Sequence, residues 1–215
     1  MRTLSLADAV ALIPDGASLM IGGFMAVGSP LRVIDELVRQ NKRNLTVIAN
    51  DTAAPGIGIG KLIGAGMVTK VIASHIGLNP ETQKNMHAGS MQVELVPQGT
   101  LVERIRAGGF GLGGILTPTG VGTLVEENKR KIEVDGKDYL LETPLRADFA
   151  LIQSFLCDYS GNLTYVLTAR NFNPVMAMAA DTVIVEAEHM VPVGLIPPDQ
   201  VVTPAPVVDY VVAHG

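Results

Sequence analysis

The sequence predicts an α/β fold: an open, mostly parallel β-sheet with helices on both faces and an added β-hairpin region. Apolar runs rich in β-branched residues alternate with segments of helical periodicity. Charged residues make up only 17% of the sequence, against about a quarter in an average domain. A sheet covered on both faces explains part of this shortfall, and a buried interface with a partner also explains it. We expect a single domain over residues 1–215.

The first unit is a strand, a glycine loop and a helix. Residues 18–21 are predicted as the strand, and the loop Gly22-Gly23-Phe24-Met25-Ala26-Val27-Gly28 follows it. Ser29 is the expected N-cap and Pro30 the first helical residue. The helix should turn one apolar stripe inward, formed by Leu31, Ile34, Leu37 and Val38.

Polar residues stand where the next strands end. These strands are predicted at residues 45–49, 71–74 and 92–96. Asn50-Asp51-Thr52 follows the first, Asn79 is expected to cap a helix after the second, and Gln98 follows the third. Open α/β sheets bind ligands beyond the carboxyl ends of their strands, so the amides of Asn50 and Gln98 are candidate donors to a developing oxyanion. Alternatively, asparagine is a common turn residue and glutamine a common surface residue.

A short helix and a glycine-rich stretch come next. Thr100 is expected to cap a helix that runs to about Ala107 and is stopped by Gly108 and Gly109. The expected inward residues are Leu101, Val102 and Ile105, and the solvent-facing ones are Glu103, Arg104 and Arg106. Gly109, Gly111 and Gly114 match G-x-G-x-x-G, but they follow a helix instead of opening one, which argues against a dinucleotide site. We expect a loop whose main chain a ligand or another subunit can approach closely.

The second half begins with a hairpin. Residues 131–134 and 137–141 are predicted to pair across Asp135-Gly136, because this dipeptide accepts the positive φ angles of a type I′ turn. Strands are predicted at 149–156, 163–166 and 182–185, with a helix starting at Asn173-Pro174. The proline-containing tail from Ile196 to Val212 is expected to be extended chain of the edge type.

Several classes of function are disfavoured by composition. A net charge of −5 without a basic patch, and few aromatic residues, argue against nucleic-acid binding. Asp8 interrupts any signal peptide, and no apolar run approaches the length that spans a membrane, so we expect a cytoplasmic protein. Cys157 is alone, and the histidines lie far apart without a ligand spacing, so no disulfide and no metal site are expected. The histidines are His75, His87, His189 and His214.

The candidate chemistry consists of binding groups without a nucleophile. Residues 22–28 offer backbone N–H groups and the positive end of the next helix to an anion, although a purely structural turn would also use glycine. Arg170 could bind a carboxylate or phosphate, or form a structural ion pair. No Ser-His-Asp or Cys-His arrangement follows from spacing, and the nearby acids are interpreted as exposed or locally paired. These acids are Glu126, Glu127, Glu186 and Glu188.

Taken together, short segments along nearly the whole chain resemble the alpha subunit of the family I CoA-transferases. They are Gly22-Gly23-Phe24 with Gly28-Ser29-Pro30, Ala49-Asn50-Asp51-Thr52, and residues 73–77, 97–101, 117–123 and 168–174. The resemblance is closest to the alpha subunits of the acetate and butyrate–acetoacetate enzymes. It is weaker to the amino half of the succinyl-CoA:3-ketoacid enzymes.

This resemblance implies an open α/β fold similar to that of sugar-phosphate isomerases, and an enzyme assembled with a homologous beta subunit. The catalytic glutamate is then expected in the beta subunit, in a glycine-flanked motif that this chain lacks. Gln98 is expected to be an auxiliary catalytic residue, and residues 22–28 correspond to the segment that binds CoA. Asn50 corresponds to a substrate-pocket residue of the ketoacid branch, although Asp51-Thr52 departs from that branch.

The implied reaction moves CoA between a short-chain acyl-CoA (acetyl-, butyryl- or acetoacetyl-CoA) and a free carboxylate, through a glutamyl-CoA thioester on the beta subunit. Coenzyme A is a substrate, and no metal or permanently bound cofactor is expected. The corresponding subunit of a 3-oxoacid (succinyl-CoA:acetoacetate) CoA-transferase is the alternative within the family. A single-chain sugar-phosphate isomerase, with its own acid or base, and a non-enzymatic CoA- or nucleotide-binding regulator are the alternatives outside it.

Overall fold

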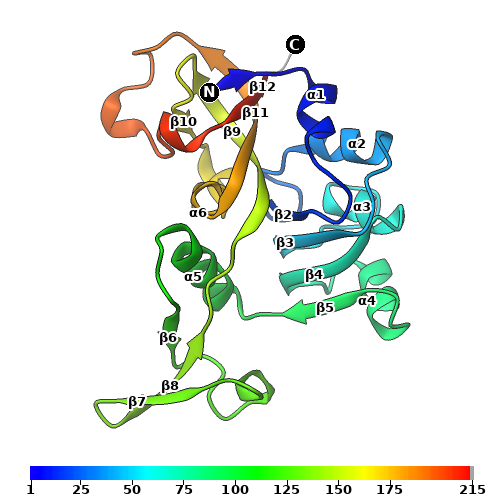
Figure 1. Cartoon of the computed structure of the whole chain (residues 1–215), viewed down its shortest axis with the longest axis vertical. Helices are drawn as coiled ribbons and strands as arrows, with labels where there is room; N and C mark the ends of the chain where they lie inside the picture. Colours follow the sequence, from blue (N-terminus) through cyan, green and yellow to red (C-terminus); the bar gives the residue numbers. More distant parts are fainter. Residues whose placement is uncertain (214–215) are drawn as a thin grey trace.

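The computed structural model describes residues 1–213, so the His214 named above lies outside the described residues. Figure 1 shows a large twisted sheet with helices packed on it and a small sheet extending away from it. The strands are β1 (Arg2–Thr3), β2 (Ser18–Ile21), β3 (Leu45–Asp51), β4 (Val68–His75), β5 (Gln92–Leu95), β6 (Ile115–Thr117), β7 (Lys131–Val134), β8 (Lys137–Glu142), β9 (Ala147–Asp158), β10 (Leu163–Thr164), β11 (Ala180–Val191) and β12 (Tyr210–Ala213). The helices are α1 (Leu6–Ala11), α2 (Leu31–Arg39), α3 (Ile59–Gly64), α4 (Pro80–His87), α5 (Gln98–Gly109) and α6 (Asn173–Met178).

The predicted open, mostly parallel sheet is confirmed. Its strand order over residues 1–213 is β1-β12-β11-β9-β2-β3-β4-β5, and all of these neighbours pair in parallel. β10 adds one antiparallel pair beside β9. The chain builds outward from β2 on one side and returns at β9 on its other side, so the order reverses between these two strands. Such a reversal is where ligands bind in open α/β sheets.

Helices cover both faces of this sheet, as predicted. Successive strand residues point to opposite faces. Accordingly, Leu19 and Ile21 belong to a core with α1, α2 and α3, whereas Met20 belongs to a core with α5 and α6. Figure 1 shows the helices α1 to α4 on one side of the sheet and α5 and α6 on the other. No helix within residues 1–213 is long and apolar enough to cross a membrane.

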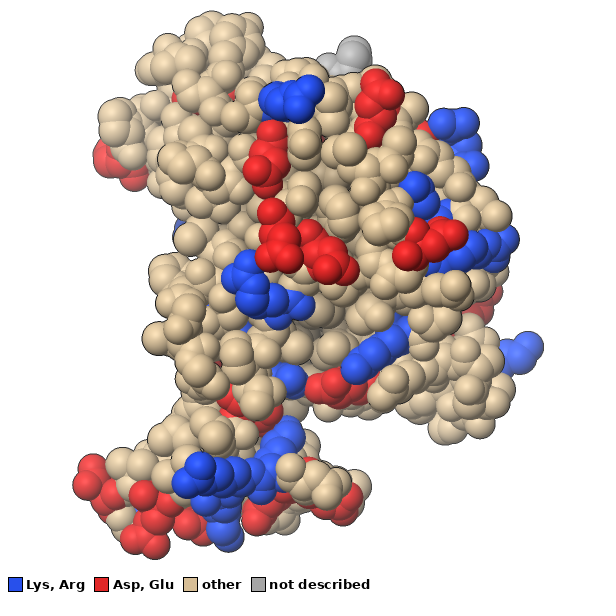
Figure 2. Space-filling view, viewed as in Figure 1, with Lys and Arg blue, Asp and Glu red and all other residues tan. Residues whose placement is uncertain are grey.

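The hairpin is also confirmed. β7 and β8 pair across Asp135 and Gly136, whose φ angles are 50° and 73°. β6 joins β8 to complete an antiparallel sheet with the order β6-β8-β7. In Figure 1 this sheet extends away from the body of the molecule, and Figure 2 shows acidic and basic side chains mixed over it.

Several sequence predictions about α5 were wrong. The helix begins at Gln98, two residues before the expected Thr100 cap, and it includes both Gly108 and Gly109. Added Cβ atoms at these glycines would lie 1.9 Å from the Leu145 carbonyl oxygen and 2.8 Å from the Met178 side chain, so their role is to let neighbours approach. Arg104 is buried instead of solvent-facing, because it donates to Glu94 and to the Thr143 carbonyl oxygen, both at 2.8 Å.

Two further corrections concern the ends of elements. Ser29 does not cap α2: its hydroxyl donates to the Gly22 carbonyl oxygen at 2.8 Å, and Pro30 takes the N-cap position without a side-chain hydrogen bond. The tail is not an edge strand, because β12 lies between β11 and β1. Asn79 does cap α4, accepting from the Thr82 N–H at 3.1 Å.

Candidate functional site at the carboxyl edge of the sheet

The predicted site residues meet beyond the carboxyl ends of β2, β3, β4 and β5. The glycine loop, residues 22–28, follows β2; Asn50 and Asp51 end β3; Ser74 lies near the end of β4; and Gln98 opens α5 after β5. Parallel strands bring these ends to one edge, so residues far apart in sequence become neighbours.

Asn50 is the centre of a hydrogen-bonded group that we call the Asn50 cluster: Asn50, Ser74, Gln98 and Asn171. Gln98 Nε2 donates to Asn50 Oδ1 at 2.8 Å, and Ser74 Oγ lies 2.8 Å from the same oxygen. Asn50 Nδ2 donates to Asn171 Oδ1 at 3.2 Å. Asn50 is only 1% exposed, whereas Gln98 is exposed. Asn50 therefore orients Gln98, whose second amide N–H makes no hydrogen bond within residues 1–213.

The sequence identified two members of this cluster and missed the other two. Ser74 could have been found by the same rule as Asn50, since it also stands at the carboxyl end of a parallel strand. Asn171 gave no such signal, because it comes from a turn after β10 and meets Asn50 across 121 positions.

The glycine loop contains a strained turn. Phe24 and Val27 exchange both backbone hydrogen bonds, at 3.0 and 2.9 Å. Met25 and Ala26 between them have φ angles of 49° and 68°, the pattern of a type I′ turn that usually takes asparagine and glycine. A positive φ angle at each of these two residues costs about 1–2 kcal/mol relative to the right-handed conformation. The Asp51 carboxylate accepts the Met25 N–H at 3.1 and 3.2 Å and so holds this turn.

This strain is concentrated at the site. Within residues 1–213, positive φ at residues other than glycine, asparagine and aspartate occurs at Met25, Ala26, Ala53 and Leu167. Met25 and Ala26 follow β2, Ala53 follows β3, and Leu167 belongs to the turn that supplies Asn171. Strained backbone of this kind persists where surrounding structure fixes it, and it clusters at functional sites.

Asn173 joins the glycine loop to the 167–171 segment, the turn that carries Leu167 and Asn171. The Asn173 side chain is fully buried, and its Nδ2 donates to the carbonyl oxygens of Gly28 and Ala169, both at 2.9 Å. An added Cβ at Gly28 would lie 2.2 Å from that Ala169 oxygen. Asn173 was predicted only as a helix start, because its role depends on contact between distant loops.

The positive helix end at this edge is not the expected one. A carboxylate already occupies the start of α2, since Glu186 Oε2 accepts the Val33 N–H at 2.9 Å. In contrast, α5 has no side-chain cap and no acidic residue in its first turn. Gly99, which is exposed and without a side chain, follows Gln98 in that turn. The first turn of α5 therefore presents both a positive dipole end and the Gln98 amide to the same space.

Asp51 is the acid that holds the glycine loop, and its burial raises the pKa of its carboxyl above the ordinary value of 3.8. Hydrogen bonds from the Met25 and Ala53 N–H groups, and the charge of nearby His75, act in the opposite direction but do not outweigh burial. Both oxygens accept backbone N–H groups. The carboxylate is therefore used to hold the loop.

The raised pKa makes a prediction about stability. The folded chain binds this proton more tightly than the unfolded chain, so the contribution of Asp51 is fully present below pH 3.8 and is lost as pH rises through the raised value. Asp51→Asn keeps an oxygen for the Met25 N–H and removes the charge. We expect the free energy of unfolding of the variant minus that of wild type to increase as pH rises. Urea unfolding at several pH values measures both quantities. A constant difference across that range would contradict it.

The other sequence candidates lie outside the Asn50 cluster. Burial raises the pKa of the Cys157 thiol to about 12, so it is a poor nucleophile. Glu126 pairs with Lys131 at 3.5 Å, and Glu188 accepts from Gln153 at 3.3 Å. Residues 1–213 contain no group of three or more His, Cys, Asp or Glu that could hold a metal.

This fold and site place the chain in a known class of enzyme. Residues 3–214 match the family described as Coenzyme A transferase, and the chain belongs to that family. Its expected class, a CoA-transferase subunit of the alpha type, is confirmed by two relatives. The alpha subunit of the acetate CoA-transferase of Escherichia coli (strain K12) is 56% identical, covering 98% of this chain and 96% of the relative. The acetoacetyl-CoA:acetate/butyrate CoA transferase alpha subunit of Clostridium acetobutylicum is 54% identical, covering 92% and 91%.

A solved structure shows the same fold within a longer chain. The acyl-CoA transferase YdiF of Escherichia coli O157:H7 is 26% identical and superimposes with a TM-score of 0.87. The match covers 99% of this chain and 47% of the YdiF chain, so the present chain spans about half of that structure.

Proposed function

We propose that this chain supplies one half of the active site of a cytoplasmic CoA-transferase, which moves CoA between a short-chain acyl-CoA and a free carboxylate. The names of its alpha-subunit relatives refer to acetate, butyrate and acetoacetyl-CoA, and they support acetyl, butyryl and acetoacetyl as the acyl groups. Coenzyme A is then a substrate, with no permanently bound cofactor. The 3-oxoacid enzymes, our alternative within the family, would use the same chemistry on another acyl group.

The nucleophile in this proposal is a glutamate of a homologous beta subunit. Its carboxylate attacks the thioester carbonyl, the C–S bond breaks, and an acyl-glutamyl anhydride and CoA thiolate result. The thiolate then attacks the glutamyl carbonyl and releases the acyl carboxylate, which leaves CoA on the glutamate. The acceptor carboxylate reverses both steps.

The observation that carries the proposal is that the Asn50 cluster, within residues 1–213, holds hydrogen-bond donors but no carboxylate. Each step above develops negative charge on a carbonyl oxygen, and the free N–H of Gln98 with the first turn of α5 can stabilise it. Asp51, the acid beside them, is buried with both oxygens engaged. Asn50, proposed from the sequence as a substrate contact, is better placed to orient Gln98.

The glycine loop is proposed to contact CoA through its apolar rim instead of a helix end. Phe24 and Val27 are 37% and 53% exposed on the loop, and Leu31 is 40% exposed where α2 begins. Leu167, at 89% exposure, lies on the neighbouring segment. Apolar side chains gathered beside a site indicate a surface that a ligand or partner covers.

This function predicts that the purified chain is inactive alone and active with its beta partner. The partner to express is the homologous subunit that carries a glycine-flanked glutamate. Initial rates of the complex should follow ping-pong kinetics, because the enzyme holds CoA between the two half-reactions.

Borohydride trapping identifies the subunit that carries the nucleophile. It reduces a glutamyl thioester, so incubation of the complex with acyl-CoA and then borohydride should modify one glutamate of the partner, detected by peptide mass spectrometry. Transfer by this chain alone, or a modified carboxylate within it, would disprove the assignment of the nucleophile to the partner.

A further inference from the structure

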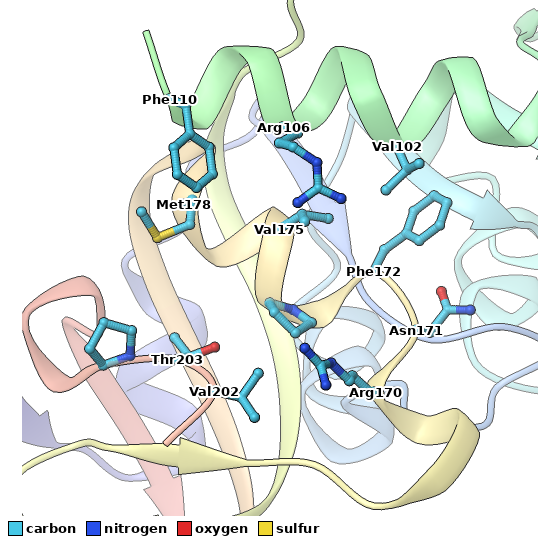
Figure 3. Close-up of a pocket in the computed structure, with 12 residues that line it drawn as sticks. Val102, Arg106, Phe110, Arg170, Asn171, Phe172, Val175, Met178, Val202 and Thr203 are labelled. Atoms are coloured by element: carbon cyan, nitrogen blue, oxygen red, sulfur yellow. The ribbon is translucent and has the colours of Figure 1, made fainter. Parts of the chain in front are cut away.

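A cavity of about 520 Å³ lies between α5, α6 and residues 202–204 (Figure 3). Its walls are mostly apolar, and Phe110, Val175 and Met178 are among them. Arg106 enters from α5 and Arg170 from the opposite wall, and Figure 3 shows both side chains extending toward the middle of the cavity. The described lining includes no aspartate or glutamate.

The two arginines are available to an external anion. Arg170 is exposed and makes no ion pair within residues 1–213, so the structural alternative considered for it is not observed there. Arg106 pairs with Glu103 at 3.0 Å, but both side chains are 45% exposed. An exposed pair of this kind is weak, and a ligand anion can replace it.

The segment that carries Arg170 has strained backbone on both sides of this residue. Leu167, three residues before it, has a φ of 49°, and Asn171, directly after it, has φ 31° and ψ −128°. Asn173 holds the Ala169 carbonyl oxygen between them. A segment strained on both sides of an unpaired arginine indicates that the position of this side chain is used.

The cavity is connected to the proposed reaction site. Asn171 lines the cavity, and its Oδ1 accepts from Asn50, which in turn accepts from Gln98. A ligand in the cavity therefore lies next to the Asn50 cluster. Arg106 and Arg170 are the charged residues among those that line the cavity.

We propose that this cavity binds the anionic far end of a substrate whose carbonyl reacts beside Gln98. The inference rests on the proposed function. A mostly apolar cavity with two guanidinium groups suits a substrate molecule that ends in a phosphate or carboxylate. This end is either a phosphate of acyl-CoA or the second carboxylate of a dicarboxylic acyl acceptor.

The test compares Arg170→Gln with wild type in the complex with the beta partner. Its KM values for acyl-CoA, butyrate and succinate are measured separately. We expect one KM to rise by about ten-fold or more with little change in kcat, because a charge-assisted contact is lost. If only the KM for acyl-CoA rises, the cavity binds a phosphate of acyl-CoA. If the KM rises for succinate but not for butyrate, the cavity binds the second carboxylate. Arg170→Lys, which keeps the charge, should recover part of the loss.

Arg43→Gln is the matched control. Arg43 is exposed and precedes β3, at the opposite edge of the sheet, so its loss removes the same charge without touching the cavity. Calorimetric binding of coenzyme A and of succinate to the two variant complexes tests the cavity without turnover, and so separates it from the proposed reaction. Equal affinities and unchanged KM values in Arg170→Gln and Arg43→Gln would overturn the proposal.

Discussion

Replacing Gln98 by alanine is expected to lower kcat of the assembled enzyme between about ten-fold and a thousand-fold, the range for loss of one oxyanion donor. One N–H of the Gln98 amide is fixed on Asn50 Oδ1 at 2.8 Å, and the other makes no hydrogen bond within residues 1–213, so it can donate to a substrate. That donor is useful only when negative charge develops on the reacting carbonyl, so KM should change much less than kcat. Steady-state kinetics of the complex measure both constants.

The variant Ser74→Ala tests the orientation of the Gln98 amide separately from the hydrogen bond that this amide donates. It removes a hydroxyl that lies 2.8 Å from Asn50 Oδ1 but leaves the Gln98 amide in place. We expect a smaller fall in kcat than for Gln98→Ala, and a double variant no worse than Gln98→Ala, because both changes act through one group. An unchanged kcat in a correctly assembled Gln98→Ala complex would show that the amide takes no part in the reaction.

The second large effect is expected at Gly28. Alanine there must adopt a φ of 77°, and its Cβ would lie 2.2 Å from the Ala169 carbonyl oxygen. Strain and overpacking together should lower the free energy of unfolding by about 2–5 kcal/mol. The 167–171 segment must also move, so Asn171 and Arg170 should lose their positions and the KM values should rise. Urea unfolding and steady-state kinetics measure these two consequences.

Gly66→Ala distinguishes the two causes. Gly66 has a φ of 64°, but an added Cβ there meets nothing within 4 Å. It should therefore show the cost of positive φ alone, about 1–2 kcal/mol, without a kinetic effect. If Gly28→Ala lowers the free energy of unfolding no more than Gly66→Ala does, close contact between the two loops is not the reason why residue 28 is glycine.

Much of the architecture follows from local sequence pattern. The strand β2 was predicted at its observed bounds, Ser18–Ile21, because an apolar run ends abruptly at two glycines. The Asp135-Gly136 turn and the Asn79 cap were also predicted correctly, since each depends on the backbone preference of one or two residues. The start of α2 was predicted wrongly, because the Ser29 hydroxyl donates to the Gly22 carbonyl oxygen across the loop instead of capping its own helix.

By itself, the sequence determined the layered α/β fold, and it led us to propose a site at the carboxyl edge of the sheet with Asn50 and Gln98 as its amides. Only the tertiary structure decided what those residues contact. It assigned Asn171 and Asn173 to the site, filled the start of α2 with Glu186, and left the start of α5 open. The physical reason is that strand and turn preferences act over a few residues. Hydrogen bonds between loops, by contrast, depend on which strand ends the completed sheet brings together.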